Sequence, residues 1–154
     1  MTAIKQPLRS LPGVLTRSQW HPPMTCLLGT PGGGKSTFGA GAPNPIFLPT
    51  EPGVENLDVA RFPVAMTLNQ FLSHLTIIAA EEHDHGAVVI DTLNGLMELY
   101  FRALKDVPGE RGRPLYDFVG FGGHSGWSGV AREIKSELLP LLRKCQARGM
   151  YVLL

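Results

Sequence analysis

Charged residues are scarce and balanced in this chain of 154 residues. They make up 18% of the chain, and 14 Lys and Arg against 13 Asp and Glu leave a formal net charge of +1. Nucleic-acid binding therefore has no support from the overall charge and must rest on local features. No segment approaches the run of about 18 apolar residues that a membrane span needs, and residues 1–23 lack the apolar centre of a signal peptide. We therefore expect a cytoplasmic protein with no membrane partner.

Cysteine is also rare. Cys26 and Cys145 lie far apart, in different predicted elements, without the spacing of metal ligands. We expect both to be small buried side chains in a reducing compartment. Glycine and proline are more abundant than usual, which predicts long loops. The length favours one folded domain, which we place at residues 24–154, after an irregular proline-rich leader at 1–23.

Short apolar strands alternate with amphipathic helices along the rest of the chain. Strands are expected at 24–28, 46–48, 87–90 and 150–154, the first of them buried on both faces. Helices are expected at 35–41, 68–79, 93–106 and 129–148. Thr67 and Gln70 form a capping box for the second helix, Pro140 should kink the last one, and Gly149 ends it. This alternation predicts an α/β fold, a mostly parallel sheet flanked by helices.

A glycine-rich segment between the first predicted strand and the first predicted helix matches the pattern G-x-x-x-x-G-K-[ST]. In such a P-loop, backbone N–H groups surround a triphosphate, Lys35 reaches the β- and γ-phosphates, and Ser36 ligates Mg²⁺. The flanking strand and helix argue against a chance glycine-rich turn. The candidate ATP-binding residues are Gly29, Thr30, Pro31, Gly32, Gly33, Gly34, Lys35, Ser36 and Thr37.

Two carboxylates complete the predicted site. Asp91 ends the buried strand 87–90, beside the P-loop, where the shell of a Mg²⁺ ion needs negative charge. Glu51 follows the strand 46–48, at the edge of the sheet where open α/β sheets bind ligands. A carboxylate there is placed to accept a proton from an attacking water. The alternatives for Glu51 are a solvated loop acid and a cap for a short helical turn at 54–57.

Four segments together resemble the RecA-like branch of P-loop ATPases, and especially short phage-encoded nucleotide-binding proteins of the AAA class. They are residues 27–37, Thr50-Glu51-Pro52-Gly53, Val89-Ile90-Asp91-Thr92 and Gly126-Trp127. The resemblance spans 24–154, although only the P-loop is specific by itself. It implies Mg²⁺-dependent ATP hydrolysis with Glu51 as the base, a DNA-contacting loop within 107–128, and sites completed by a neighbouring subunit of a homo-oligomer. It also implies a sensor residue and a fifth core strand beyond Leu154, so we expect the core to be incomplete at its C-terminal end.

The predicted function is thus an ATPase of phage-type DNA recombination or repair. One alternative is a small-molecule or nucleotide kinase, which shares the P-loop but needs an acceptor pocket and usually an arginine-rich lid. Another is a nucleotide-dependent binding module without catalysis.

Two further features are open to more than one interpretation. In the glycine-rich segment 107–128, Arg111 and Arg113 suit phosphate contacts and aromatic residues such as Tyr116 suit base stacking. The alternative is that the aromatic residues pack this loop against the domain. The run His83-Asp84-His85 has no third ligand nearby, so it favours a solvated turn over a metal site.

Overall fold

The computed structural model of the protein describes residues 20–105, 107 and 124–154. Most of the predicted leader and most of the segment 107–128, with Arg111, Arg113 and Tyr116, lie outside the described residues. Among the described residues, every helix falls short of the length and apolarity that a bilayer crossing demands.

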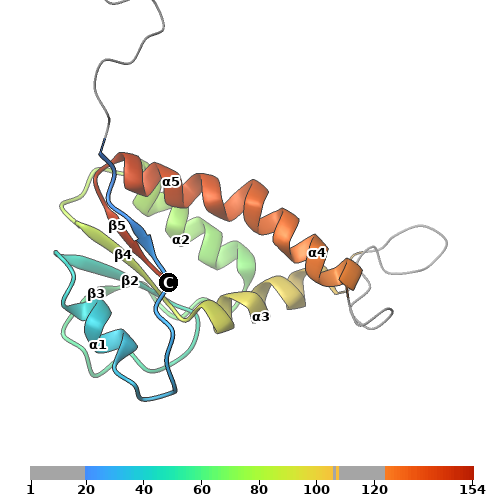
Figure 1. The fold of residues 1–154 in the computed structure, drawn as a ribbon, viewed down its shortest axis with the longest axis horizontal. Coiled ribbons are helices and arrows are strands. Elements are labelled where there is room, and N and C mark those ends of the chain that lie inside the picture. Colours follow the sequence, from blue (N-terminus) through green and yellow to red (C-terminus); the bar gives the residue numbers. More distant parts are fainter. Residues whose placement is uncertain (1–19, 106, 108–123) are drawn as a thin grey trace, which may run out of the picture.

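Five strands form one parallel sheet, which confirms the predicted α/β fold (Figure 1). Their order across the sheet is β1-β5-β4-β2-β3. The strands are β1 (Met24–Thr25), β2 (Pro45–Pro49), β3 (Ala60–Arg61), β4 (Ala87–Asp91) and β5 (Tyr151–Leu153). The sequence did not predict β3, because both of its residues are exposed and it has no apolar run to mark it. The strand expected as the fourth is therefore the fifth.

The helices agree with the predicted periodicity up to residue 104. They are α1 (Lys35–Ala40), α2 (Leu68–Ala80), α3 (Leu93–Leu104), α4 (His124–Glu133) and α5 (Leu139–Ala147), with a π-helical turn at Ile134–Leu138. The Thr67 hydroxyl accepts a hydrogen bond from the Gln70 backbone N–H at 3.2 Å, as the capping box predicts. The Gln70 side chain completes the cap one residue earlier than expected, by accepting from the N–H of Met66 at 2.9 Å.

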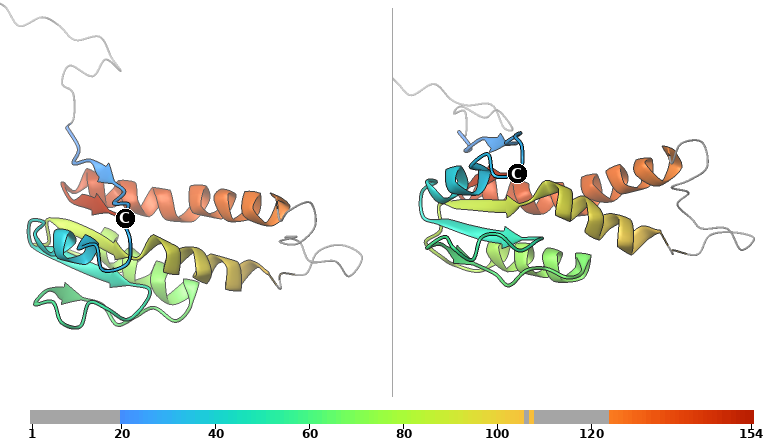
Figure 2. Two further views of the ribbon diagram at one scale, coloured as in Figure 1. Left: turned by 60° about the horizontal axis from the view of Figure 1, so that its bottom comes forward. Right: turned by 90° about the horizontal axis from the view of Figure 1, so that it is seen from below.

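The last helical segment differs from the prediction at its start and at its proline. It begins at His124 rather than Gly129, so Gly126 and Trp127 lie inside α4 and not before a helix. Figure 2 shows α4 and α5 following one another as one long helix that continues through Pro140. The π turn comes just before the proline, and there the N–H of Leu139 bonds the carbonyl of Ile134. A wider turn therefore precedes the proline and the helix continues past it, while the kink at Pro140 stays a prediction.

Gly149 ends the helix as predicted. Its φ of 86° is left-handed, and the N–H groups of Gly149 and Met150 bond the carbonyls of Gln146 at 2.9 Å and Cys145 at 3.1 Å. This is the Schellman arrangement, in which a left-handed residue, usually glycine, closes the last turn. It turns the chain directly into β5.

The core has two parts because the sheet is covered on both faces. Val88, Ile90 and Val152 face a large cluster built with α2, α3 and α5. Phe47, Val89 and Leu153 face a smaller cluster beneath α1 and the segment after β2. Cys145 belongs to the large cluster, as predicted, and burial raises the pKa of its thiol to about 11.

Tyr100, on α3, is completely buried, and among the described residues its hydroxyl has no hydrogen-bond partner. Burial raises the pKa of the phenol above its ordinary value, so the group stays neutral. An unpaired buried hydroxyl costs stability, so Tyr100→Phe is expected to raise the free energy of unfolding by about 1 kcal/mol. Urea denaturation would measure this. A lower free energy of unfolding in the variant would show that the hydroxyl has a partner.

Candidate active site

The parallel arrangement brings the predicted site residues to one edge of the sheet. The P-loop leaves the end of β1, Glu51 follows β2, and Asp91 ends β4. The ends of β2 and β4 are level, because Pro49 pairs with Asp91 in the ladder. The carboxyl ends of parallel strands lie together, which is where open α/β sheets bind ligands.

The P-loop has the backbone that its glycines predict. Gly32 and Gly34 have φ values of 73° and 82°, in the left-handed region that side chains other than glycine disfavour. Gly33 closes a tight turn by donating its N–H to the carbonyl of Thr30 at 3.0 Å, and a Cβ on Gly33 would lie only 3.0 Å from that oxygen. Helix α1 begins at the next residue, Lys35. Glycine is therefore favoured by conformation at Gly32 and Gly34 and by a tight contact at Gly33.

The ammonium group of Lys35 lies within the loop. It donates to the carbonyl oxygens of Gly29 at 2.9 Å and Thr30 at 3.0 Å. An ammonium has three N–H donors, so one remains for a phosphate oxygen after these two bonds. Two anchors within the loop thus hold the positive charge where the motif predicts it.

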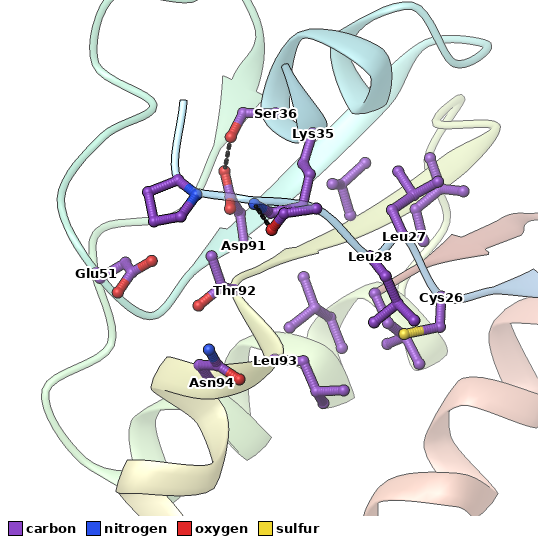
Figure 3. A pocket seen from close by; sticks show the side chains of 16 residues that line it. Cys26, Leu27, Leu28, Lys35, Ser36, Glu51, Asp91, Thr92, Leu93 and Asn94 are labelled. Carbon is purple, nitrogen blue, oxygen red and sulfur yellow. Dashed lines mark hydrogen bonds between the residues drawn. The ribbon is translucent and has the colours of Figure 1, made fainter. Parts of the chain in front are cut away.

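Ser36 and Asp91 meet although they are 55 residues apart in sequence. The hydroxyl of Ser36 donates to Oδ2 of Asp91 at 2.6 Å, and Figure 3 shows this bond at the centre of the site. A hydroxyl and a carboxylate supply the hard oxygen ligands that Mg²⁺ prefers, usually one or two from protein with the rest from water and substrate phosphates. The donor set therefore fits a Mg²⁺ ion, and the assignment of these two residues as its ligands stays a prediction.

Glu51 faces the P-loop across a cavity of about 300 Å³. The walls of this cavity are residues 31–37, residues 51–53, Asp91 and Thr92. The Glu51 side chain is exposed and, within the described part of the chain, has no hydrogen-bond or ion-pair partner. The alternative role as a helix cap has no support. The segment after it forms a single turn closed by the N–H of Leu57, and Glu55 accepts the N–H of Gly53 at 2.7 Å.

An adjoining cavity of about 360 Å³ shares Lys35, Ser36, Glu51 and Asp91 with the first cavity and has an additional apolar wall. That wall comes from the ends of β1, β4 and β5 and the start of α3: Cys26, Leu27, Leu28, Val89, Ile90, Leu93, Leu153 and Leu154. Figure 3 shows the labelled leucines and Cys26 on the opposite side of Asp91 and Thr92 from Glu51.

Two predictions about this wall are wrong. Cys26 is exposed rather than buried, and Leu28 is 92% exposed. The strand expected at 24–28 is only two residues long, and it lies at the edge of the described sheet with β5 as its one neighbour. An apolar run does not fix where a strand ends, and here Cys26 and Leu28 lie beyond β1, on the segment that leads into the P-loop.

Thr50 and Thr92 make hydrogen bonds beside the site that the sequence did not predict. The hydroxyl of Thr50 donates to the carbonyl oxygen of Thr92 at 2.8 Å and accepts from its N–H at 2.9 Å. The hydroxyl of Thr92 in turn caps α3, accepting from the N–H of Gly95 at 3.1 Å. The peptide bond between Asp91 and Thr92 is cis. The available signal was positional, since Thr50 stands beside the predicted base Glu51 and Thr92 beside the predicted metal ligand Asp91.

The histidines of the run His83-Asp84-His85 are half-buried and bonded to the main chain, rather than solvated. His83 Nε2 lies 2.9 Å from the carbonyl oxygen of Ile78, and its Nδ1 accepts from the N–H of His85 at 3.2 Å. Nδ1 is thus the acceptor, which leaves the proton on Nε2. Among the described residues, no group of three His, Cys, Asp or Glu side chains is arranged to hold a metal ion.

Comparison with known proteins gives one match. A family model described as an AAA domain matches residues 21–150, which include the P-loop, Glu51 and Asp91. No curated protein and no solved structure matches the chain. An AAA domain is a nucleotide-binding domain of the ATPase type, in which binding is typically Mg²⁺-dependent. Because the match covers most of its length, this chain belongs to the AAA domain family.

Proposed function

We propose that the protein binds ATP together with Mg²⁺ at residues 29–37 and hydrolyses the γ-phosphate. The observation that carries this proposal is the 2.6 Å hydrogen bond between Ser36 and Asp91 beside the P-loop. It joins the two predicted metal ligands at the edge of the cavity that Glu51 faces. Membership of the AAA domain family supports the same reading of the site.

The binding step follows from the charges in the cavity. Left-handed glycines are typical of loops whose backbone N–H groups form a concave anion site, which suits the oxygens of a triphosphate. Lys35 adds a positive charge held within the loop. Ser36 and Asp91 would hold Mg²⁺, which when bound neutralises charge on the β- and γ-phosphates.

In the chemical step, Glu51 is the residue that takes up a proton. A water oxygen forms a bond to the γ-phosphorus while the bond from that phosphorus to the β,γ-bridging oxygen breaks, and ADP leaves with the electron pair. The carboxylate of Glu51 accepts the proton that the water loses. Lys35 offsets the negative charge that develops on the phosphate oxygens. The position of Glu51 after β2 is the one that the RecA-like resemblance implies.

The proposed setting is phage-type DNA recombination or repair, with single-stranded DNA as the partner. It rests on the resemblance and on the segment 107–128. Trp127, which lies near the end of that segment and within α4, is 47% exposed, and its ring lies 6.5 Å from the ring of Phe101 on α3. An exposed aromatic ring suits base stacking, and the sequence places Arg111 and Arg113 in the same segment.

Phosphate release with and without single-stranded DNA tests the proposed function. We expect Mg²⁺-dependent hydrolysis of ATP that single-stranded DNA stimulates. Replacing both Arg111 and Arg113 by alanine should weaken DNA binding for all sequences. It should also flatten the dependence of affinity on salt by up to about 1.4 in log–log slope, at about 0.7 per phosphate contact.

Two other outcomes would contradict the proposal and identify its alternatives. Turnover that needs a small-molecule acceptor and ignores DNA would indicate a kinase, for which the apolar-walled cavity of about 360 Å³ beside the phosphate site offers an acceptor pocket. Nucleotide binding without turnover under either condition would indicate a nucleotide-dependent binding module.

A further inference from the structure

A single hydroxyl group connects the ends of the two strands next to the predicted metal ligand Asp91 and the predicted base Glu51. Thr50 and Thr92 follow the paired residues Pro49 and Asp91, and the N–H of Thr50 extends the ladder by donating to the carbonyl of Asp91 at 2.8 Å. The Thr50 hydroxyl then bonds both main-chain groups of Thr92, its carbonyl at 2.8 Å and its N–H at 2.9 Å. We call these three hydrogen bonds the threonine clasp.

The start of α3 is shaped around this clasp. The carbonyl of Thr92 also accepts the first hydrogen bond of the helix, from the N–H of Leu96 at 3.1 Å. Gly95 passes so close to Thr50 that a Cβ on it would overlap the Thr50 hydroxyl and lie 2.9 Å from the Thr50 Cβ. No real Cβ comes so near, so the absence of a side chain at position 95 is what leaves room for the clasp.

The clasp acts on the site through the backbone. Thr50 directly precedes Glu51, and Thr92 directly follows Asp91, whose carboxylate accepts the 2.6 Å bond from Ser36. Thr50 itself lines neither cavity, and its hydroxyl proton is already donated to Thr92. It is therefore placed neither to ligate the metal nor to take part in proton transfer.

We propose that Thr50 is a positioning residue, which holds the Asp91 carboxylate in line with Ser36 and fixes the start of the Glu51 loop. This inference rests on the proposed function, because it assigns a support to the same Mg²⁺ and hydrolysis site. Groups that orient metal ligands typically change metal affinity or activity by about 10–100-fold when removed. The quantity to measure is the Mg²⁺ benefit, which is the ratio of the Kd of ATP in EDTA to its Kd with Mg²⁺.

Thr50→Val keeps the shape of the side chain and removes its hydroxyl. By isothermal titration, we expect the Mg²⁺ benefit to fall by about 10–100-fold while the Kd in EDTA stays near that of the parent. A role confined to stability would lower the unfolding temperature and leave this ratio unchanged. Thr50→Ser restores the hydroxyl and should recover most of the benefit. Thr76→Val is the matched control, since Thr76 lies exposed on α2 and, within the described part of the chain, its hydroxyl bonds the carbonyl of Leu72 alone.

Gly95→Ala provides a second test that leaves Thr50 in place. Its methyl group should displace the Thr50 hydroxyl and lower the Mg²⁺ benefit in the same way, so this variant decides the question if Thr50→Val fails to fold. In the double variant Thr50→Ala with Gly95→Ala, the loss of Mg²⁺ benefit should be smaller than the sum of the losses in the two single variants. The reason is that the methyl group at position 95 then meets alanine rather than threonine at position 50. A parental Mg²⁺ benefit in folded Thr50→Val, or in Gly95→Ala, would overturn the role of Thr50 alone. Failure of the parent protein to bind ATP under any condition would overturn the proposed function with it.

Discussion

Replacing Lys35 by alanine is expected to weaken the binding of MgATP by about 100-fold or more. Among the described residues that line the two cavities, Lys35 has the only cationic side chain. Each hydrogen bond that involves a charged group contributes about 1.5–3 kcal/mol, and the phosphates would lose at least one such bond together with its charge. Isothermal titration with ATP, in Mg²⁺ and in EDTA, measures the change, and the deficit should be present in both solutions.

Two comparison variants separate the roles of the loop residues. Ser36→Ala removes a predicted metal ligand but no charge, so it should weaken MgATP binding more than metal-free ATP binding. Lys144→Ala removes an exposed lysine from α5, which covers the face of the sheet opposite α1. This variant should bind MgATP like the parent. Unchanged MgATP affinity in Lys35→Ala would refute the assignment of residues 29–37 as the phosphate site.

Local patterns were sufficient to predict the elements that face the core. The apolar spacing of Phe71, Leu75 and Ile78 predicted α2, and the continuous run at 87–90 predicted the central strand β4. In both cases the geometry of the element decides which side chains are apolar: every third or fourth residue on the buried face of a helix, and every residue of a strand buried on both faces. Such a pattern can be recognised without knowing which elements pack against it. The Schellman ending at Gly149 was predictable for the same reason, since it depends on one residue's backbone preference.

The features that could not be predicted depend on neighbours in space. The apolar run at 24–28 looks like a five-residue strand, but pairing with β5 makes a strand of Met24 and Thr25 alone. Cys26 lies beyond that pairing and is exposed. The π turn before Pro140 was likewise not predicted, because the sequence shows that an N–H is missing but not how the neighbouring turn rearranges around it.

The candidate site also contains contacts that could be predicted from the sequence and contacts that could not. The meeting of Ser36 with Asp91 was predictable, because a motif and a strand end placed both at the carboxyl edge of one parallel sheet. The threonine clasp was not predictable. Its hydroxyl group on Thr50 bonds main-chain atoms of Thr92, 42 residues away, and every residue type has these main-chain atoms. Gly95 shows the same limit. In the sequence, a glycine within a helix indicates only reduced helix stability. The structure shows that the missing side chain at position 95 leaves room for Thr50.

Replacing Glu51 by glutamine is expected to leave MgATP affinity near that of the parent while the rate of hydrolysis falls by about 10²–10⁴-fold. Glutamine keeps the size of the side chain and an oxygen that accepts hydrogen bonds, but it cannot take up a proton. The Glu51 carboxylate is exposed to the cavity and unpartnered within the described part of the chain, so the substitution breaks no contact that holds the fold. Single-turnover phosphate release at saturating MgATP measures the chemical step apart from binding.

Glu55→Gln is the matched control for this substitution. Glu55 lies four residues further along the same loop and is also exposed, but it accepts a hydrogen bond from the N–H of Gly53 at 2.7 Å, which the oxygen of a glutamine can retain. Its replacement removes one negative charge from the loop without touching the residue that faces the P-loop. Glu55→Gln should therefore hydrolyse ATP at the parental rate. A parental rate in Glu51→Gln as well would show that Glu51 is a solvated loop acid, whereas equal losses in both variants would show that the charge of the loop matters and not a base at position 51.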